Sequence, residues 1–209
     1  MTAMDAAMMP FSVEIDLAAG IMKSPKARTV RNASAMRGHY LDADALERLI
    51  AENDDPLHYS VDEWPVPEEY GHIMFCISTL QPGKIGNEYF MTKGHYHTVL
   101  HTGEIYLCLR GRGYMLMKTK EGRFAAERME KDRMVYIPPF WAHRSVNTGG
   151  EPLISYCVYN AEAGHNYGDI EKEGFPERVY KRAGKVEFVS SFGVQPPGGD
   201  IGRRPSKAG

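Results

Sequence analysis

Residues 92–104 read TKGHYHTVLHTGE, and this stretch decides the fold and the chemistry expected for the chain. In an extended strand, side chains two positions apart lie on one face, with their bases roughly 6.5–7 Å apart. The rings of His95 and His97 can therefore converge on one ion, whereas a helix would separate them. The threonine–glycine pair just before Glu104 predicts a turn that brings the next strand back beside the two histidines.

A second motif lies farther along the chain, where residues 138–147 read PPFWAHRSVN. His143 follows the Pro-Pro corner and would be a fourth ligand, delivered from a distant strand. A His-x-His pair also arises by chance, and many strand histidines bind nothing. The carboxylate of Glu104 at a strand start and the additional histidine favour a metal site over that alternative.

The donor types narrow the choice of ion. Three imidazoles and one carboxylate suit one divalent iron, manganese, nickel or zinc ion per subunit. Octahedral coordination by four protein ligands would leave two positions open for water or substrate, and open positions indicate catalysis rather than a structural role.

Both motifs resemble a known family. Residues 94–111 resemble the first cupin motif, and residues 138–147 resemble the second. The two motifs alone span dozens of activities. More narrowly, residues 92–97 and 136–144 are similar to the cupin-type glucose-6-phosphate isomerases, also called phosphoglucose isomerases, and the similarity extends over about residues 59–165.

This resemblance implies a cupin jelly-roll, a β-barrel or sandwich, and an isomerase that interconverts glucose 6-phosphate and fructose 6-phosphate in glycolysis and gluconeogenesis. It also implies a homodimer, and a histidine, His165, near the reacting end of the sugar. The family pattern has threonine where this chain has Ser78, which keeps a hydroxyl with a less restricted rotamer. The positions that match the family's phosphate contacts are Tyr59, Ser78, Thr92, Gly94 and Tyr159.

The strand that begins at Glu104 adds a residue by alternation. Glu104 and Tyr106 share one face, and Leu107 lies on the other. If Glu104 points at the metal, so does Tyr106, so the expected catalytic residues are Glu104, Tyr106 and His165.

An isomerase of this kind must open the sugar ring, polarise the oxygens on carbons 1 and 2, and move hydrogen between those carbons. A bound metal with two open positions would serve as a Lewis acid. Glu104 is then either a ligand throughout or the base that takes the carbon 2 proton to give an enediol. A metal-assisted hydride shift is the alternative, and the sequence accommodates both routes.

Two functions from other classes fit part of the same pattern. A metal-dependent cupin dioxygenase could use the three histidines and Glu104, and it would consume oxygen on turnover. A non-catalytic sugar-binding cupin could keep the fold, but it would not need Glu104, Tyr106 and His165 together.

Length and patterning predict one all-β domain. The 209 residues can bury one good core, so we expect a single domain over 1–194 with an N-terminal extension. The resemblance implies that this is a cupin domain with a barrel core at about 59–165. Short strands between glycine-rich turns favour a sandwich or barrel with a few short peripheral helices. Residues 195–209 have no apolar period, and we expect them to be disordered.

The net charge and the cysteine content limit which classes of partner and which cellular compartment we expect. With 25 lysines and arginines against 27 acidic residues, no basic field favours nucleic acid or an anionic membrane. The three cysteines lie in apolar runs without paired spacing, which suits reduced thiols in the cytoplasm. No secretory signal is recognised, and no run approaches the roughly 18 apolar residues of a membrane span. A sugar phosphate held by local donors is the expected partner.

Four further elements can be placed by pattern. Residues 11–16 alternate as a strand, residues 71–80 are apolar enough for a central strand, and residues 186–189 suit an edge strand. Asp44, followed three residues later by glutamate, predicts the cap of a short helix over 44–53 that packs outside the sheet.

Overall fold

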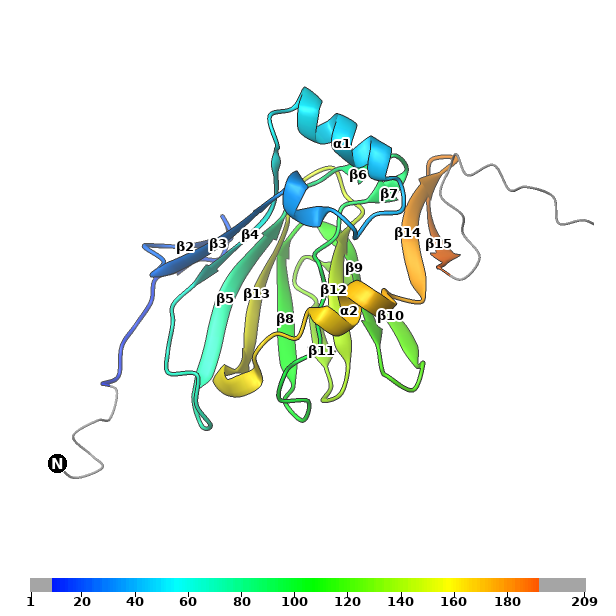
Figure 1. Cartoon of the computed structure of the whole chain (residues 1–209). Helices are drawn as coiled ribbons and strands as arrows, with labels where there is room; N and C mark the ends of the chain where they lie inside the picture. The colour runs from blue at the N-terminus through cyan, green and yellow to red at the C-terminus, as the bar shows by residue number, and fades with distance from the viewer. Residues whose placement is uncertain (1–8, 192–209) are drawn as a thin grey trace, which may run out of the picture.

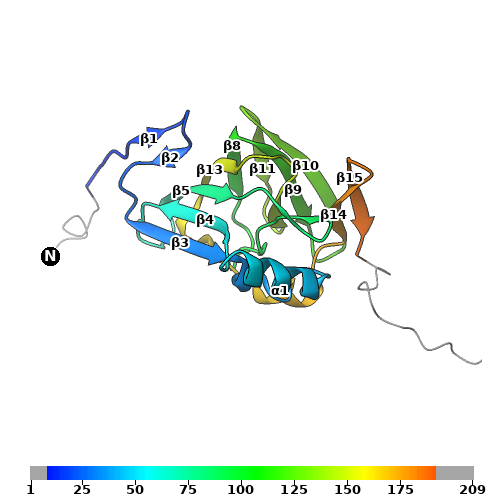
Figure 2. The ribbon, with the colours of Figure 1, turned by 90° about the horizontal axis from the view of Figure 1, so that it is seen from above.

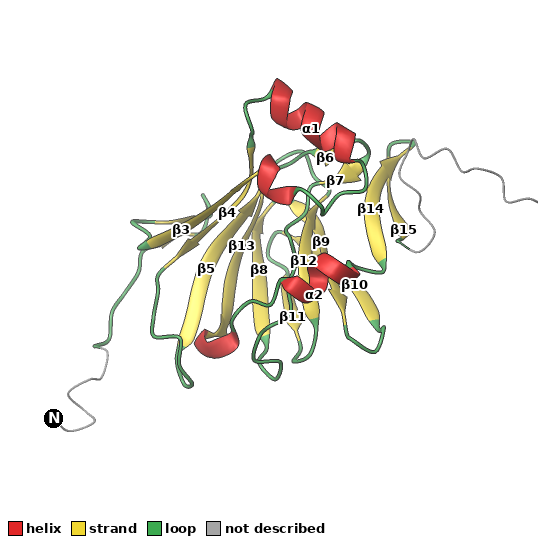
Figure 3. Cartoon of the chain, viewed as in Figure 1, coloured by secondary structure: helices red, strands yellow, loops and turns green. Residues whose placement is uncertain are grey.

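The computed structural model describes residues 9–191, and β-strands are its main regular elements (Figure 1 and Figure 3). The all-β expectation with a few short peripheral helices is confirmed. No helix within the described range is long and apolar enough to span a membrane. The predicted tail at 195–209 lies outside the described residues. The helical elements are α1 (Ala43–Glu52), α2 (Gly168–Glu173), and the 3₁₀ turns η1 (Ala33–Met36) and η2 (Ala161–Ala163).

The larger sheet has six strands, and every pairing in it is antiparallel. The strand expected over 71–80 is β5, which lies in the interior of this sheet, as predicted. Across the sheet the order is β11 (Met134–Ile137), β8 (Glu104–Arg110), β13 (Leu153–Asn160), β5 (Ile73–Leu80), β4 (Leu57–Glu63) and β3 (Ala27–Asn32).

A three-stranded sheet packs against the larger one, in the order β10 (Phe124–Glu130), β9 (Arg112–Lys118) and β12 (Ala142–Asn147). The main apolar core contains residues of both sheets, for example Leu80 and Cys108 with Met115 and Val146. Within the described residues no ladder joins the two sheets, so they form a sandwich rather than the closed barrel that was one form of the expectation.

A further sheet has four strands, in the order β15 (Lys185–Ser190), β14 (Glu177–Arg182), β7 (Glu88–Tyr89) and β6 (Lys84–Ile85). Strand β15 contains the predicted segment 186–189 and lies at the edge of the sheet, as expected. The β14–β15 hairpin extends from the side of the sandwich in Figure 2.

The N-terminal part of the described chain forms a small hairpin, β1 (Ile15–Asp16) with β2 (Ile21–Met22), at one end of the sandwich (Figure 2). The strand expected over 11–16 is therefore wrong in its length, because only its last two residues pair. Met22 is 1% exposed and packs with Ile77 and Leu109 of the larger sheet. The hairpin thus covers the sheet face that points away from the three-stranded sheet.

Helix α1 lies above the sheets, as expected, but its cap differs from the prediction (Figure 1). The side chain of Asp42, not Asp44, accepts a hydrogen bond of 2.9 Å from the backbone N–H of Ala45, so the helix begins at Ala43. An N-cap side chain lies just outside the helix and accepts from the second or third helical residue, and Asp42 meets both conditions whereas Asp44 lies inside the helix. Asp44 lies in the first turn, where its charge complements the helix dipole.

Candidate metal centre and substrate pocket

The two histidine motifs meet through their backbones. His95 N–H donates to the carbonyl of His143 at 3.2 Å, and His143 N–H donates to the carbonyl of His95 at 3.0 Å. Within residues 92–97, His95 and Tyr96 form isolated bridges, and Gly94 has a positive φ of 77°, so the regular strand that the spacing predicted is not formed. The prediction that His95 and His97 share one side still holds, because their ring centroids are 5.7 Å apart.

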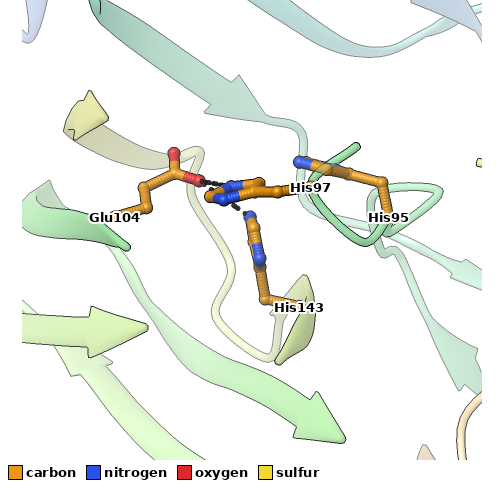
Figure 4. Close-up of side chains that lie close together, drawn as sticks. All are labelled: His95, His97, Glu104 and His143. Carbon is orange, nitrogen blue, oxygen red and sulfur yellow. Dashed lines mark hydrogen bonds and ion pairs between the residues drawn. The ribbon is translucent and has the colours of Figure 1, made fainter. Parts of the chain in front are cut away.

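Glu104 opens β8 and completes the donor set, while His143 comes from β12 (Figure 4). Oε2 of Glu104 lies 3.1 Å from Nε2 of His97 and 3.0 Å from Nε2 of His143. One donor atom from each of His95, His97, Glu104 and His143 lies within 4.8 Å of all the others. The four residues singled out by spacing are therefore brought together.

The orientation of the His97 ring is fixed by a hydrogen bond on the side away from Glu104. Its Nδ1 lies 2.8 Å from Oγ1 of Thr102, and that hydroxyl donates its own hydrogen to the carbonyl of Val99 at 2.7 Å. The hydroxyl must therefore accept from His97, which places the proton on Nδ1. Nε2 is left with a free lone pair that faces the centre, the arrangement found behind metal-binding histidines.

The ionisation states also suit a cation. Burial would by itself raise the pKa of Glu104, but the adjacent His143 and His97 lower it well below its usual range, so the group is a carboxylate. Burial, together with His143, lowers the pKa of His95, which keeps that imidazole neutral. Nε2 of His95 and of His143 are buried with no properly oriented hydrogen-bond partner in the described chain. Three imidazoles and a carboxylate whose donor atoms gather around one point fit a divalent ion.

The donor set lies in the wall of a cavity of about 410 Å³ between the sheets. His97 supports the set from behind and does not line the cavity. Ten of the residues predicted for the site do line it: Tyr59, Ser78, Thr92, Gly94, His95, Glu104, Tyr106, His143, Tyr159 and His165.

One end of the cavity carries aromatic and imidazole groups next to the donor set. The ring of His165 lies 4.5 Å from that of His95, and the ring of Tyr106 lies 5.7 Å from that of His143. Burial lowers the pKa of His165, and burial and Glu104 raise the pKa of Tyr106, so both groups are neutral near pH 7. They can donate hydrogen bonds beside the donor set without adding charge.

The hydroxyl-bearing residues are spread along the wall. Tyr59 is 6% exposed, and burial raises the pKa of its phenol to about 12. Oγ1 of Thr92 accepts a hydrogen bond of 3.1 Å from Ser145 N–H. The phenol of Tyr159 donates to Oε1 of Glu63 at 3.2 Å.

Sequence reasoning missed several residues of the cavity. Tyr167 stacks on His165, with ring centroids 5.9 Å apart and planes 9° apart, and its spacing of two from His165 was the available signal. Lys93 and Arg31 also line the cavity and give it two cationic groups. Arg31 is opposite Tyr59 in the β3–β4 register, a placement that no local pattern predicts.

The three cysteines are free and buried, in agreement with the expectation of reduced thiols. Their relation was not visible in the sequence. Cys76 and Cys157 are directly opposite each other in the β5–β13 ladder, and Cys76 lines the cavity.

Comparison with known proteins gives consistent matches. The family model described as glucose-6-phosphate isomerase (GPI) matches residues 30–192, a wider span than the 59–165 inferred from the motifs. The glucose-6-phosphate isomerase of Thermococcus gammatolerans is 45% identical over 182 residues, which cover 87% of this chain and 95% of that protein. The enzyme of Thermococcus litoralis is 43% identical, covering 85% of this chain and 92% of that protein. The enzyme of Pyrococcus furiosus is 42% identical, covering 87% and 95% respectively.

These matches cover the segment that contains every donor of the candidate metal centre and every predicted residue that lines the cavity. They run over nearly the full length of the relatives. The chain belongs to the glucose-6-phosphate isomerase family.

Proposed function

We propose that this protein interconverts glucose 6-phosphate and fructose 6-phosphate as a metal-dependent aldose–ketose isomerase. The observation that carries the proposal is the donor set of three histidines and Glu104 in the wall of a cavity large enough for a sugar phosphate. The family membership supports the same reaction.

His95, His97, Glu104 and His143 would hold one divalent ion per subunit, an iron, manganese, nickel or zinc ion. When bound, such an ion supplies Lewis acidity to the oxygens on carbons 1 and 2 of the sugar. The protein contributes the geometry, because the backbone bridge between His95 and His143 and the contact from Thr102 to His97 fix the ligands before binding.

Glu104, Tyr106 and His165 are the residues that we assign to the chemistry. Glu104 is ionised, so its second oxygen can accept the carbon 2 proton in an enediol route. In a hydride-shift route Glu104 remains a ligand only. Tyr106 and His165 would donate hydrogen bonds to the sugar oxygens, since both are neutral groups that line the cavity.

The phosphate would bind at Tyr59, Ser78, Thr92, Gly94 and Tyr159. All five line the cavity, and three of them offer hydroxyls on neighbouring strands of one sheet. Arg31 and Lys93, found only in the structure, add positive charge to the same wall. A phosphate dianion therefore meets both hydrogen-bond donors and cations.

We further propose a homodimer that works in the cytoplasm. Strand β11 is an edge strand, and two of its apolar side chains are exposed: Met134 at 57% and Tyr136 at 60%. An exposed apolar edge suits contact with a second copy. Light scattering of the purified protein measures the mass, and a monomer across micromolar concentrations would contradict the dimer.

The test of the function compares two substrates. The metal-free protein with each metal restored should convert fructose 6-phosphate readily and free fructose poorly, because the binding energy of the phosphate holds carbons 1 and 2 against the metal. An oxygen electrode should record no uptake. Equal rates on both sugars would contradict a phosphosugar isomerase, and oxygen consumption would favour a dioxygenase.

Thr92→Val sharpens this comparison. Valine keeps the shape of threonine and removes the hydroxyl, so activity on fructose 6-phosphate should fall while the low activity on fructose stays the same. Coupled assays on both sugars measure the effect. A loss common to both sugars would indicate damage to the neighbouring His95 instead.

A further inference from the structure

Arg144 is a buried arginine next to a metal ligand, yet neither the metal centre nor the cavity includes it. It follows His143 on β12, and alternation turns its side chain away from the cavity. Arg144 is 3% exposed. Its Nε donates to the carbonyl of Lys93 at 3.2 Å, and its Nη2 donates to the same oxygen.

The geometry of a trans peptide gives this contact a consequence. The C=O of one residue and the N–H of the next point in opposite directions, and the described chain has no cis peptide. By holding the Lys93 carbonyl on its own side, Arg144 turns the N–H of Gly94 toward the cavity, which Gly94 lines.

The N–H of Gly94 is a donor without a partner. Gly94 is buried, and within residues 9–191 no acceptor is found for its N–H. Buried backbone N–H groups are almost always paired, so this orphan donor points to a ligand in the cavity.

The loop is held closely against the arginine. Gly94 has φ +77°, and a Cβ built on it would lie 2.9 Å from Cε2 of Phe175 and 3.1 Å from Cβ of Arg144. The guanidinium of Arg144 in turn lies 4.7 Å from the centroid of the Phe175 ring. Phe175 therefore packs on both the loop and the arginine, and it limits the movement of either.

Arg144 has no ion-pair partner of its own within the described chain, although the carboxylate of Glu88 interacts with it electrostatically. Glu88 pairs with Arg178 at 2.8 Å, and no ion pair within the described chain includes Arg144. Burial and Arg178 lower the pKa of Arg144 to about 10, which still leaves it charged near pH 7. A buried cation behind the loop, which shares the carboxylate charge of Glu88 with Arg178, attracts an anion on the other side of the loop.

We propose that Arg144 is a positioning residue for phosphate recognition, which presents the Gly94 N–H to the phosphate and places a positive charge behind the loop without touching the substrate. This inference rests on the proposed isomerase function. It divides the two polar groups of a single peptide unit: the Lys93 carbonyl is held by the protein, and the Gly94 N–H is offered to the ligand.

The test is Arg144→Lys, which keeps the charge and loses the forked donation to Lys93. We expect KM for fructose 6-phosphate and the inhibition constant of inorganic phosphate each to rise about tenfold, the scale of one charge-assisted hydrogen bond. Metal content and kcat should change little. The matched control is Arg178→Lys, which alters another arginine that donates to a backbone carbonyl, that of His39, and should leave both constants unchanged.

A second variant keeps the test valid if Arg144→Lys folds poorly. Phe175→Leu removes the ring from the guanidinium and should raise the same two constants by a smaller factor. A wild-type KM and inhibition constant in both variants would overturn the inference. Loss of metal or of kcat alone would overturn it too, because it would indicate that Arg144 supports His143 rather than the phosphate site. If the unmutated protein does not isomerise fructose 6-phosphate, the proposed function itself has failed.

Discussion

At the residue scale, one carboxylate oxygen organises the centre. Oε2 of Glu104 lies 3.1 Å from His97 and 3.0 Å from His143. A cation at this point would be attracted by the carboxylate charge and would lie close to both imidazoles. Of the four proposed ligands, His97 has its tautomer fixed by a hydrogen bond to Thr102. Its removal should therefore affect metal binding more than it affects folding.

His97→Ala should lower metal content and activity together, by about tenfold or more, since even loss of groups behind a ligand costs roughly 10–100-fold. Elemental analysis and the coupled assay measure the two losses. His101→Ala, an exposed histidine on the same loop, is the matched control and should change neither. A full metal complement in pure His97→Ala protein would show that the ligand assignment is wrong.

Spacing predicted three of the four donors because the information needed for them is local, whereas His143 was predicted from the second motif. The pair His95–His97 and the following Glu104 lie within one short stretch, and alternation suffices to place them. Arg31 could not be found in this way, since its place in the cavity depends on which residue of β4 stands opposite it. The cross-strand position of Cys76 opposite Cys157 depends on the strand register in the same way.

At the scale of elements, the alternation of β8 was predicted correctly. Glu104 and Tyr106 line the cavity, while Leu107 packs on the outer side with Met22 and Ile77. Other elements were predicted less well. The N-terminal strand is shorter than its pattern, and the cap of α1 is Asp42, because several acidic residues near a helix start compete and only the local backbone selects among them.

The two faces of β8 should respond differently to substitution. Tyr106→Phe removes a hydroxyl beside the metal centre, so turnover should fall while stability and metal content remain. Leu107→Asn places an amide among apolar side chains and should cost about 1 kcal/mol of unfolding free energy, the low end of the range because Leu107 is half-buried. Thermal melts and turnover measurements separate the two effects. A larger fall in melting temperature for Tyr106→Phe than for Leu107→Asn would show that the two faces are assigned the wrong way round.

At the scale of the whole molecule, buried histidines outside the metal centre tie stability to pH. His58 is fully buried, and its Nε2 lies 2.9 Å from the hydroxyl of Tyr40 and 3.1 Å from the carbonyl of Met91. Burial lowers the pKa of His58 from 6.5 to about 4, and burial together with Arg144 lowers that of His39 to about 4. The folded protein therefore resists protonation at both sites.

Stability should fall as the pH drops from about 6.5 to about 4. The folded pKa is the lower one, so the unfolded chain binds the proton first in this window, and the contribution is complete only above the unfolded pKa. Each histidine adds a slope of up to about 1.4 kcal/mol per pH unit. Urea unfolding across the window measures the slope, and His58→Gln should flatten it. An unchanged slope in that variant would exclude His58 as a source.

The backbone bridge between His95 and His143 also has a consequence for the order of folding. The parts of the chain that it joins are far apart, as the contact between Lys93 and Arg144, 51 positions apart, illustrates. Such pairings form late and slow the folding of β proteins, so the donor set does not exist until the sheets have associated. The ion cannot act as a nucleus, and it stabilises only the native state. In stopped-flow experiments, added Mn²⁺ should leave the refolding rate unchanged and slow unfolding, whereas faster refolding would mean that the ligands meet early.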